Sequence, residues 1–209
     1  MIFDNNIAYQ TYRVLITIFG TLGMCVTTSR IKENKMKNRM IVCGYAVYAI
    51  AFSFLCIRFF GFLFYLRGAI FTISIPGVVI TFLIADTTIS KHIFCCLSQL
   101  LLSLYLLVGV TLLNTLLGGN TMTNVLLLLP AYLAMIFLEY FFLRNAFLDF
   151  ADTVSGNWRV LAPIPCSFFL FDMAILLFPA HYTQNTSYFI LFALSGAVLL
   201  IVYYAIFQY

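Results

Sequence analysis

The sequence predicts an all-α fold, a polytopic membrane bundle of seven transmembrane helices, and three observations lead to this prediction. Hydrophobic residues make up 64% of the 209 residues, charged residues make up only 9%, and the mean hydropathy is +1.05. The apolar residues form runs close to the roughly 20 residues that a helix needs to cross a bilayer. Basic residues stand mostly at the ends of these runs. Such a chain cannot bury its apolar surface in a water-soluble core, so we expect one transmembrane domain over residues 1–209.

The first two helices are expected at residues 7–28 and 40–57, on either side of the most basic segment of the chain. That segment carries one acid, Glu33, and five basic residues: Arg30, Lys32, Lys35, Lys37 and Arg39. Because lysine and arginine in short loops are retained in the cytoplasm, the segment indicates an N-terminus on the outer side of the membrane.

The third helix is expected at residues 68–89, after an aromatic segment at 58–66. We interpret the aromatic segment as a connection at the outer interface, where phenylalanine and tyrosine are stable. Pro76 lies in the middle of the third helix and predicts a kink, because proline removes a backbone donor and obstructs the preceding turn. A six-helix alternative treats residues 58–89 as one re-entrant element.

The remaining four helices are expected at residues 93–117, 125–143, 159–178 and 188–207. The turn at 118–124 is rich in glycine and asparagine and should lie outside. A short polar connector should join Arg144 to Trp158. Arg144 and Arg159 indicate that it lies on the inner side, and Trp158 suits this interface because tryptophan prefers the headgroup region. With seven crossings, the C-terminus is cytoplasmic.

The distribution of charge supports this orientation. Of the 11 basic residues, all except Arg13, Arg58 and Arg67 fall at inner helix ends in this scheme. The residues that mark the inner interface are Arg30, Lys32, Lys35, Lys37, Arg39, Lys91, Arg144, Trp158 and Arg159. Positive-inside topology therefore explains the net charge of +4, and the lipid bilayer, rather than a nucleic acid, is the expected partner.

Metal, cofactor and catalytic motifs are not found in the sequence. The six cysteines fall within or beside apolar runs, without a C-x-x-C pair or a Cys/His metal spacing, so no disulfide framework, metal or cofactor is inferred. His92 precedes Cys95 and Cys96, and residues three or four positions apart share a helix face. This pairing leaves a membrane cysteine protease as one interpretation, which predicts His92 within hydrogen-bond reach of a cysteine.

Three ionisable residues in the outer half form a candidate ligand-binding site, because charges at membrane depth are costly. Arg13 and Asp172 lie about 9 Å and about 10 Å below the outer surface at about 1.5 Å per helical residue. This match in depth predicts an ion pair, with Arg67 at the outer end of the third helix. The pair could simply hold two helices together, or the second arginine could leave a positive charge for a carboxylate or another anion.

Other polar residues within the apolar runs are given structural roles. Glu139 and Asp86 lie near the inner face and are expected to snorkel or to pair with nearby Arg144 and Lys91. Hydrogen bonds across helices are expected from Ser98, Gln99, Ser103 and Asn114.

The residues at the expected helix ends suggest a family. Lys91 and Phe94 open a helix, FLEYFFLRNAF contains Arg144 at a helix end, NWRVLAPIP spans 157–165, and an outer turn begins at Pro179. In this order, over about the last two thirds of the chain, the pattern resembles the N-terminal multi-helix sensor region of clostridial histidine kinases with a GHKL-type ATPase domain. The resemblance implies a bacterial plasma-membrane sensor whose last helix passes a displacement to a cytoplasmic kinase.

We therefore expect the membrane sensor and signal-transmission domain of a bacterial two-component system, acting as a homodimer. Its cue would be a small or peptide ligand, extracellular or membrane-borne, bound near Arg13, Arg67 and Asp172. The catalytic kinase domains are not part of residues 1–209. The alternative from another class is a small-solute binding or transport subunit of the vitamin-uptake type, and the third interpretation is the membrane cysteine protease.

Overall fold

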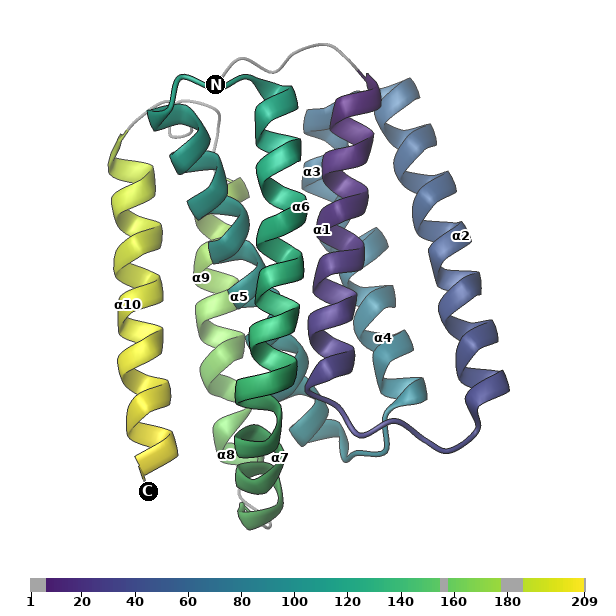
Figure 1. The fold of residues 1–209 in the computed structure, drawn as a ribbon, viewed down its shortest axis with the longest axis vertical. Coiled ribbons are helices and arrows are strands. Elements are labelled where there is room, and N and C mark those ends of the chain that lie inside the picture. The colour runs from purple at the N-terminus through teal and green to yellow at the C-terminus, as the bar shows by residue number, and fades with distance from the viewer. Residues whose placement is uncertain (1–6, 155–157, 178–185, 209) are drawn as a thin grey trace.

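The computed structural model describes residues 7–154, 158–177 and 186–208, and nearly all of them are helical (Figure 1). The described residues contain no strand, only one isolated antiparallel bridge between Ile31 and Ala85. That bridge joins two loops at one end of the bundle, where Lys32 N–H donates to the Ile84 carbonyl at 2.9 Å and Asp86 N–H donates to the Arg30 carbonyl at 2.8 Å. The all-α prediction is confirmed.

Seven helical rods run along the described part of the chain, as predicted. Four of them are single α-helices: α1 (Ile7–Thr27), α2 (Lys35–Phe60), α5 (Ile89–Leu116) and α10 (Thr186–Gln208). Three are composite: α3 (Phe62–Ala69), the π-helical turn η1 (Ile70–Ser74) and α4 (Ile75–Ile84); α6 (Thr121–Leu138), the π-helical turn η2 (Glu139–Leu143) and α7 (Arg144–Thr153); and α8 (Trp158–Leu161) with α9 (Pro163–Leu177).

The rods alternate in direction, so the first described helix starts at one end of the bundle and the C-terminus lies at the other (Figure 1). The end that holds the C-terminus also holds the segment from Arg30 to Arg39, Lys91, Arg144 and Arg159, and we call it the basic end. Four helices of the described residues are long and apolar enough to cross a membrane: Lys35–Phe60, Ile89–Leu116, Met122–Phe150 and Trp158–Ile175. Length and composition thus indicate a membrane protein.

Two connections differ from the prediction. The aromatic segment 58–66 is helical, because Gly61 alone separates α2 from α3. Gly61 has φ 84°, a conformation that glycine adopts easily, and its N–H caps α2 by donating to the Ile57 carbonyl. The third rod consequently begins at Phe62 and ends at Ile84 instead of spanning 68–89. It is separate from α2, in agreement with seven rods rather than six.

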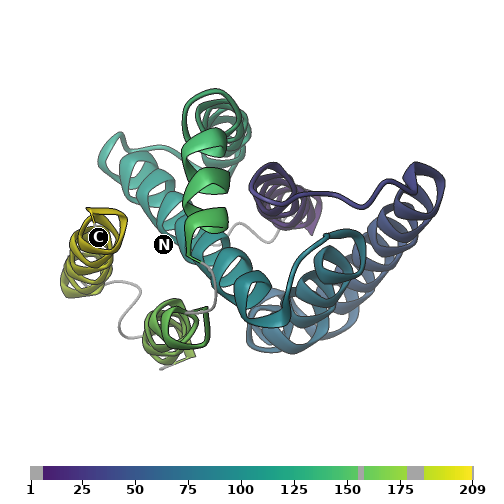
Figure 2. The same cartoon turned by 90° about the horizontal axis from the view of Figure 1, so that it is seen from below.

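The polar connector predicted after Arg144 is also helical. It forms α7, which crosses the basic end of the bundle (Figure 2). Phe147 and Phe150 share one face of α7, whereas Asp149 and Asp152 lie at other positions around it. This amphipathic pattern allows the helix to lie with its apolar side against the bundle.

Close packing of α1 against α5 and α6 forms the centre of the fold. A Cβ atom at Gly20 would lie 2.3 Å from the ring of Tyr132, so only glycine permits this approach of α1 to α6. The buried hydroxyl of Ser103 on α5 contacts Thr21 of α1 and lies 2.6 Å from Tyr132 Oη of α6. Ser103 therefore bonds across helices as predicted.

The irregularity expected at Pro76 takes the form of η1. Proline cannot donate to the carbonyl four residues earlier, so the backbone before Pro76 opens into a π-helical turn. Two tyrosines of α2 satisfy carbonyls of this turn. Tyr48 Oη donates to the Thr72 carbonyl at 2.8 Å, and Tyr45 Oη donates to the Ile73 carbonyl at 3.0 Å. Pro76 thus explains why the turn forms, and tyrosine hydroxyls hydrogen-bond to two of its carbonyls.

Candidate ligand-binding site

Two residues of the predicted outer site, Arg13 and Asp172, form no ion pair with each other in the described structure. Arg13 Nη2 donates to Thr111 Oγ1 of α5 at 3.1 Å. Asp172, on α9, makes no hydrogen bond to any described residue with either carboxylate oxygen. The expected Arg13–Asp172 ion pair is therefore not formed, and the side chain of Arg67 lies outside the described part of the structure.

Asp172 is nevertheless an unusual residue. Its side chain is 0% exposed and lies beside Tyr105 of α5 and Ser195 of α10. The hydroxyls of Tyr105 and Ser195 are 3.0 Å apart and bond to each other. Asp172 therefore marks the place where α5, α9 and α10 meet, and the hydroxyls of Tyr105 and Ser195 are the donors nearest to its carboxyl.

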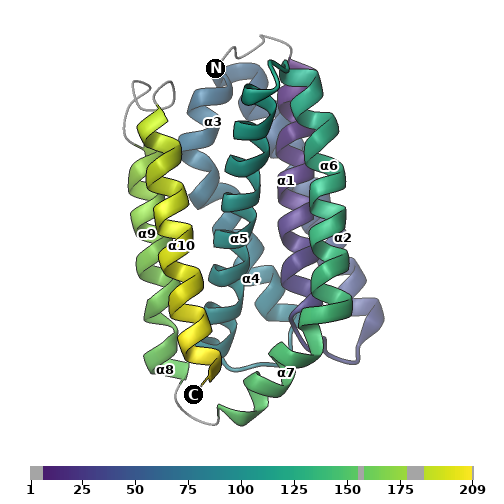
Figure 3. The same cartoon turned by 60° about the vertical axis from the view of Figure 1, so that its left-hand side comes forward.

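A cavity of about 1200 Å³ lies between α5, α6, η2, α7 and α10. Figure 3 shows how α5, α6, α7 and α10 are arranged. On α5 its lining extends from Phe94 to Leu112, which corresponds to about 27 Å along the helix axis. Leu200 of α10 lines the cavity and is also 68% exposed, so the cavity opens sideways on the surface of the bundle. Small-molecule pockets usually measure about 300–1000 Å³, so this space can hold a larger or longer molecule.

Small residues on two helices create the space. The cavity is lined by Gly109 of α5 and by Ala193, Gly196 and Ala197 of α10. A Cβ atom at Gly109 would have no other atom within 4 Å, so the space beside this residue is open. The cavity exists because these residues have little or no side chain to fill the space between α5 and α10. The two helices are held together by hydrogen bonds between hydroxyls, Ser98 with Tyr203 and Tyr105 with Ser195.

Glu139, the first residue of η2, lies in the lining of the cavity toward the basic end and is 1% exposed. Its Oε2 atom accepts a hydrogen bond from Thr27 Oγ1 of α1 at 3.1 Å, whereas Oε1 has no partner among the described residues. Gln99 of α5 also lines the cavity, and its Oε1 atom likewise has no partner. Two unsatisfied acceptor oxygens therefore lie in the lining of an apolar cavity.

The predicted snorkelling of Glu139, or its pairing with Arg144, is wrong. Glu139 is buried, and Arg144 instead donates from Nε to the Thr27 carbonyl at 3.1 Å. Thr27 thus contacts both residues, one through its hydroxyl and the other through its carbonyl. The π-helical turn at positions 139–143 changes how Glu139 and Arg144 are placed relative to each other. Its backbone bond from Arg144 N–H to the Glu139 carbonyl spans five residues instead of the four of an α-helix.

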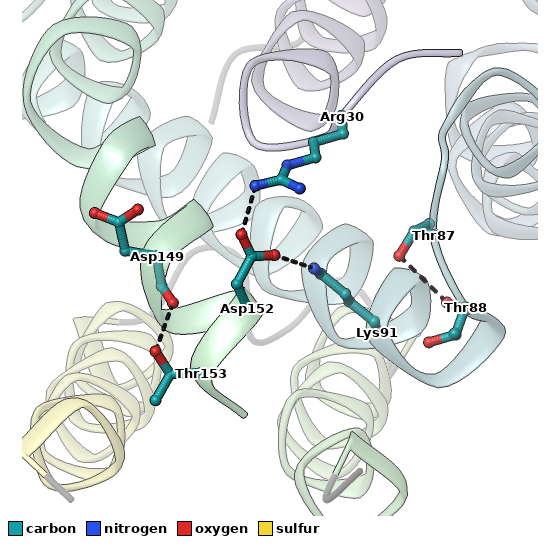
Figure 4. Close-up of polar contacts among 7 residues, drawn as sticks. All are labelled: Arg30, Thr87, Thr88, Lys91, Asp149, Asp152 and Thr153. Atoms are coloured by element: carbon teal, nitrogen blue, oxygen red, sulfur yellow. Dashed lines mark hydrogen bonds and ion pairs between the residues drawn. The ribbon is translucent and has the colours of Figure 1, made fainter. Parts of the chain in front are cut away.

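Helix α7 forms the floor of the cavity through Phe147 and Phe150. On its other side, the Asp152 carboxylate forms ion pairs with Arg30 and with Lys91 Nζ, the latter at 3.7 Å (Figure 4). Asp152 therefore links α7 to the loop after α1 and to the start of α5. Two of the predicted interface markers, Arg30 and Lys91, have this second role.

His92 and Cys96 meet as the protease interpretation predicted, but the pair is closed to a substrate. Nε2 of His92 lies 3.2 Å from Cys96 Sγ, and the two residues are only 2% and 1% exposed. Nε2 also lies 3.0 Å from the Val78 carbonyl, and a carbonyl can only accept. A proton on Nε2 would be donated to this carbonyl, and the other ring nitrogen, Nδ1, lies 3.8 Å from Cys96 Sγ, so burial rather than proton placement closes the pair.

No group of three or more metal-ligating side chains was found within the described residues. No family model, curated protein or solved structure matches the chain. The resemblance to kinase sensor regions therefore stays a prediction from the sequence, and the cavity with Glu139 and Gln99 is the site that the geometry itself supports.

Proposed function

We propose that this protein is a bacterial membrane sensor domain that binds a hydrophobic, membrane-borne cue in the cavity between α5, α6, α7 and α10. The observation that carries the proposal is the cavity itself: about 1200 Å³ of largely apolar space with a sideways opening. In a bilayer such an opening would face lipid, so a hydrophobic molecule could enter without crossing water. The opening also favours a receptor over the transport alternative, for which an enclosed cavity would be expected.

The orientation in the membrane is part of the proposal. The basic end would lie in the cytoplasm of the cell, because short loops rich in lysine and arginine stay inside. The long axis of the cavity would then run across the bilayer, and Glu139 would lie in its cytoplasmic half. The protein would be a multi-pass component of the plasma membrane.

Helix α7 offers a route from ligand to response. A molecule in the cavity would contact Phe147 and Phe150, and the same helix reaches Arg30 and Lys91 through Asp152. Signalling requires that the ligand binds two arrangements of the protein with different affinity. Movement of α7 and of the neighbouring α10 would change the cytoplasmic face, where the resemblance to GHKL-type histidine kinases suggests that a kinase and a second copy of the chain would respond.

Trp158 provides a direct test of binding. It is the single tryptophan of the chain, and its ring lies 5.4 Å from Phe94 and 6.0 Å from Phe150, both of which line the cavity. Nitroxide-labelled alkyl chains with amine, alcohol or carboxylate heads would be titrated into lipid nanodiscs that contain the protein. We expect saturable quenching of Trp158 fluorescence by at least one probe.

A matched pair of variants separates the cavity from general partitioning into lipid. Gly109→Phe places a ring in the cavity, whereas Gly44→Phe places the same ring on an exposed face of α2, and neither position has another atom within 4 Å of a new Cβ. The saturable quenching should disappear in Gly109→Phe and persist in Gly44→Phe. Equal quenching in both variants, or only linear quenching in the wild type, would refute the proposal. Hydrogen exchange over residues 144–153 should change with the probe if α7 transmits binding.

A further inference from the structure

We propose, on the basis of the proposed receptor function, that the cavity recognises an alkyl-borne ammonium group, held by Glu139 and Gln99, with the hydrocarbon chain extending along α5. The ligand class is therefore a cationic amphiphile whose head donates hydrogen bonds. The assignment comes from the kind of polar atoms that the cavity leaves without partners.

The two unsatisfied oxygens in the lining are both acceptors. Glu139 Oε1 and Gln99 Oε1 have no hydrogen-bond partner among the described residues, and the Gln99 side chain lies within reach of the Glu139 carboxyl, so the two residues form one site. The nearby hydroxyl of Ser98 is already engaged, donating to the Phe94 carbonyl at 2.6 Å and contacting Tyr203. A ligand that fits these oxygens must bring donors, and a primary ammonium group brings three.

The charge points the same way. The ion pairs of the described residues join Asp152 to Arg30 and Lys91, and none of them involves Glu139. Arg144, the nearest basic residue along the chain, uses Nε on the Thr27 carbonyl and lies over the Tyr140 ring at 5.4 Å. A cationic head would supply the missing counter-charge of the Glu139 carboxylate, whereas an anionic head would meet a like charge.

The shape of the cavity favours a long chain on that head. From Gln99 to Leu112 the lining of α5 extends for about 20 Å toward the opposite end of the bundle. This stretch contributes Leu102, Val108 and Leu112, and α10 contributes Phe192 and Leu199. A head at Glu139 therefore directs its chain away from the basic end, into the apolar part of the cavity.

The test compares three nitroxide-labelled probes of equal chain length, an alkylamine, an alkyl alcohol and a fatty acid, by saturable quenching of Trp158 in phosphatidylcholine nanodiscs. We expect the amine to bind at least about tenfold more tightly than the alcohol, and the fatty acid to bind most weakly. A label near the head should quench Trp158 more than a label at the chain end, because Glu139 and Trp158 share the same half of the bundle.

Two variants test the assigned contacts. Glu139→Gln keeps the size of the side chain and an acceptor oxygen but removes the charge, so it should abolish the preference for the amine over the alcohol. Gln99→Leu removes a neutral acceptor and should reduce the preference by a smaller factor. Saturable binding of amine and alcohol with equal affinity would overturn the ammonium assignment and leave the receptor proposal standing, whereas no saturable binding of any probe would refute both.

The source of the ammonium group is distinguished by the lipid of the nanodisc. If the natural ligand is a membrane aminolipid, phosphatidylethanolamine nanodiscs should weaken binding of the alkylamine by competition. If it is a free amine, binding should be the same in phosphatidylethanolamine and phosphatidylcholine. Both results agree with an ammonium-binding site, and a fatty acid that outcompetes the amine in either lipid would contradict it.

Discussion

The two π-helical turns η1 and η2 have the same length. They differ in what causes them and in whether the polar groups beside them have hydrogen-bond partners. The first precedes Pro76, and tyrosine hydroxyls of α2 bond to its Thr72 and Ile73 carbonyls. The second contains no proline, and it begins with Glu139, whose Oε1 atom has no partner in the described structure.

The difference separates an architectural irregularity from a functional one. A π-helical turn costs stability because its backbone bonds are poorer, so it persists only for a reason. Around η1 the reason is proline, and the Thr72 and Ile73 carbonyls accept hydrogen bonds from tyrosine hydroxyls. At η2, by contrast, the Glu139 carboxyl lines the cavity and one of its oxygens has no hydrogen-bond partner among the described residues. An unsatisfied buried group is expected of a residue that serves ligand binding rather than stability. Mutations at the two turns should therefore have opposite consequences.

The largest expected effect is at the first turn. A Cβ atom at Gly77 would lie 2.9 Å from Tyr45 Oη, so Gly77→Val should displace the tyrosine and lower the free energy of unfolding by about 3 kcal/mol. Gly68→Val is the matched control on the same rod, because no other atom lies within 4 Å of a new Cβ there. Thermal unfolding of the purified proteins measures both. A loss of stability in the control equal to that in Gly77→Val would show that valine itself, not the contact, is responsible.

Removing a single hydroxyl should have a smaller effect. Tyr45→Phe leaves the buried Ile73 carbonyl without its donor and should lower the free energy of unfolding by about 1–2 kcal/mol. Tyr48→Phe removes the corresponding bond to Thr72 at a residue that is 41% exposed, and should cost about 0.5 kcal/mol. Neither variant should alter quenching of Trp158 by the alkylamine. If Tyr48→Phe cost more than Tyr45→Phe, burial would not explain the stability of this turn.

The ion pairs below the second turn should contribute little. Asp152→Asn removes ion pairs of a half-exposed carboxylate with Arg30 and Lys91, so the free energy of unfolding should fall by at most about 1 kcal/mol, and by less at high salt. Its larger effect should be on α7, as faster hydrogen exchange of residues 144–153. Exchange that stays as slow as in the wild type would exclude Asp152 as the link between α7 and the rest of the basic end.

The smallest effect on stability is expected at the second turn. Glu139→Leu removes an incompletely bonded carboxyl, and the single proton of the Thr27 hydroxyl, shared between Glu139 and the Met24 carbonyl in the wild type, can then be donated to Met24 alone. The free energy of unfolding should therefore stay within about 0.5 kcal/mol of the wild type or rise, while selective binding of the alkylamine is lost. A large loss of stability would make Glu139 a structural residue like Tyr45 and would erase the contrast between the turns.

Hydropathy and charge predicted the number of rods and the gathering of basic residues at one end, because both depend only on composition along the chain. They did not predict the single-residue turn at Gly61 or the helix α7. Aromatic and amphipathic segments look alike in sequence whether they lie at an interface or form a helix, and their course is decided by tertiary packing.

The candidate site was less predictable, for a geometric reason. Counting residues gives the depth of Arg13 and Asp172 but not the direction in which each helix turns them, and in the structure they do not meet. The sequence alone marks Glu139 as a candidate functional residue, because any acid in an apolar run is a candidate site. Its nearness to Arg144 in the sequence suggested a surface pair, and the π-helical turn between them makes that expectation fail.

Native mass spectrometry of the protein released from membranes with its bound molecules tests the central claim most directly. The wild type and the Gly44→Phe variant should each carry a long-chain ammonium amphiphile, about one per chain, that the Gly109→Phe variant lacks. The same adducts, in the same amount, on all three proteins would contradict the claim that this cavity is a binding site.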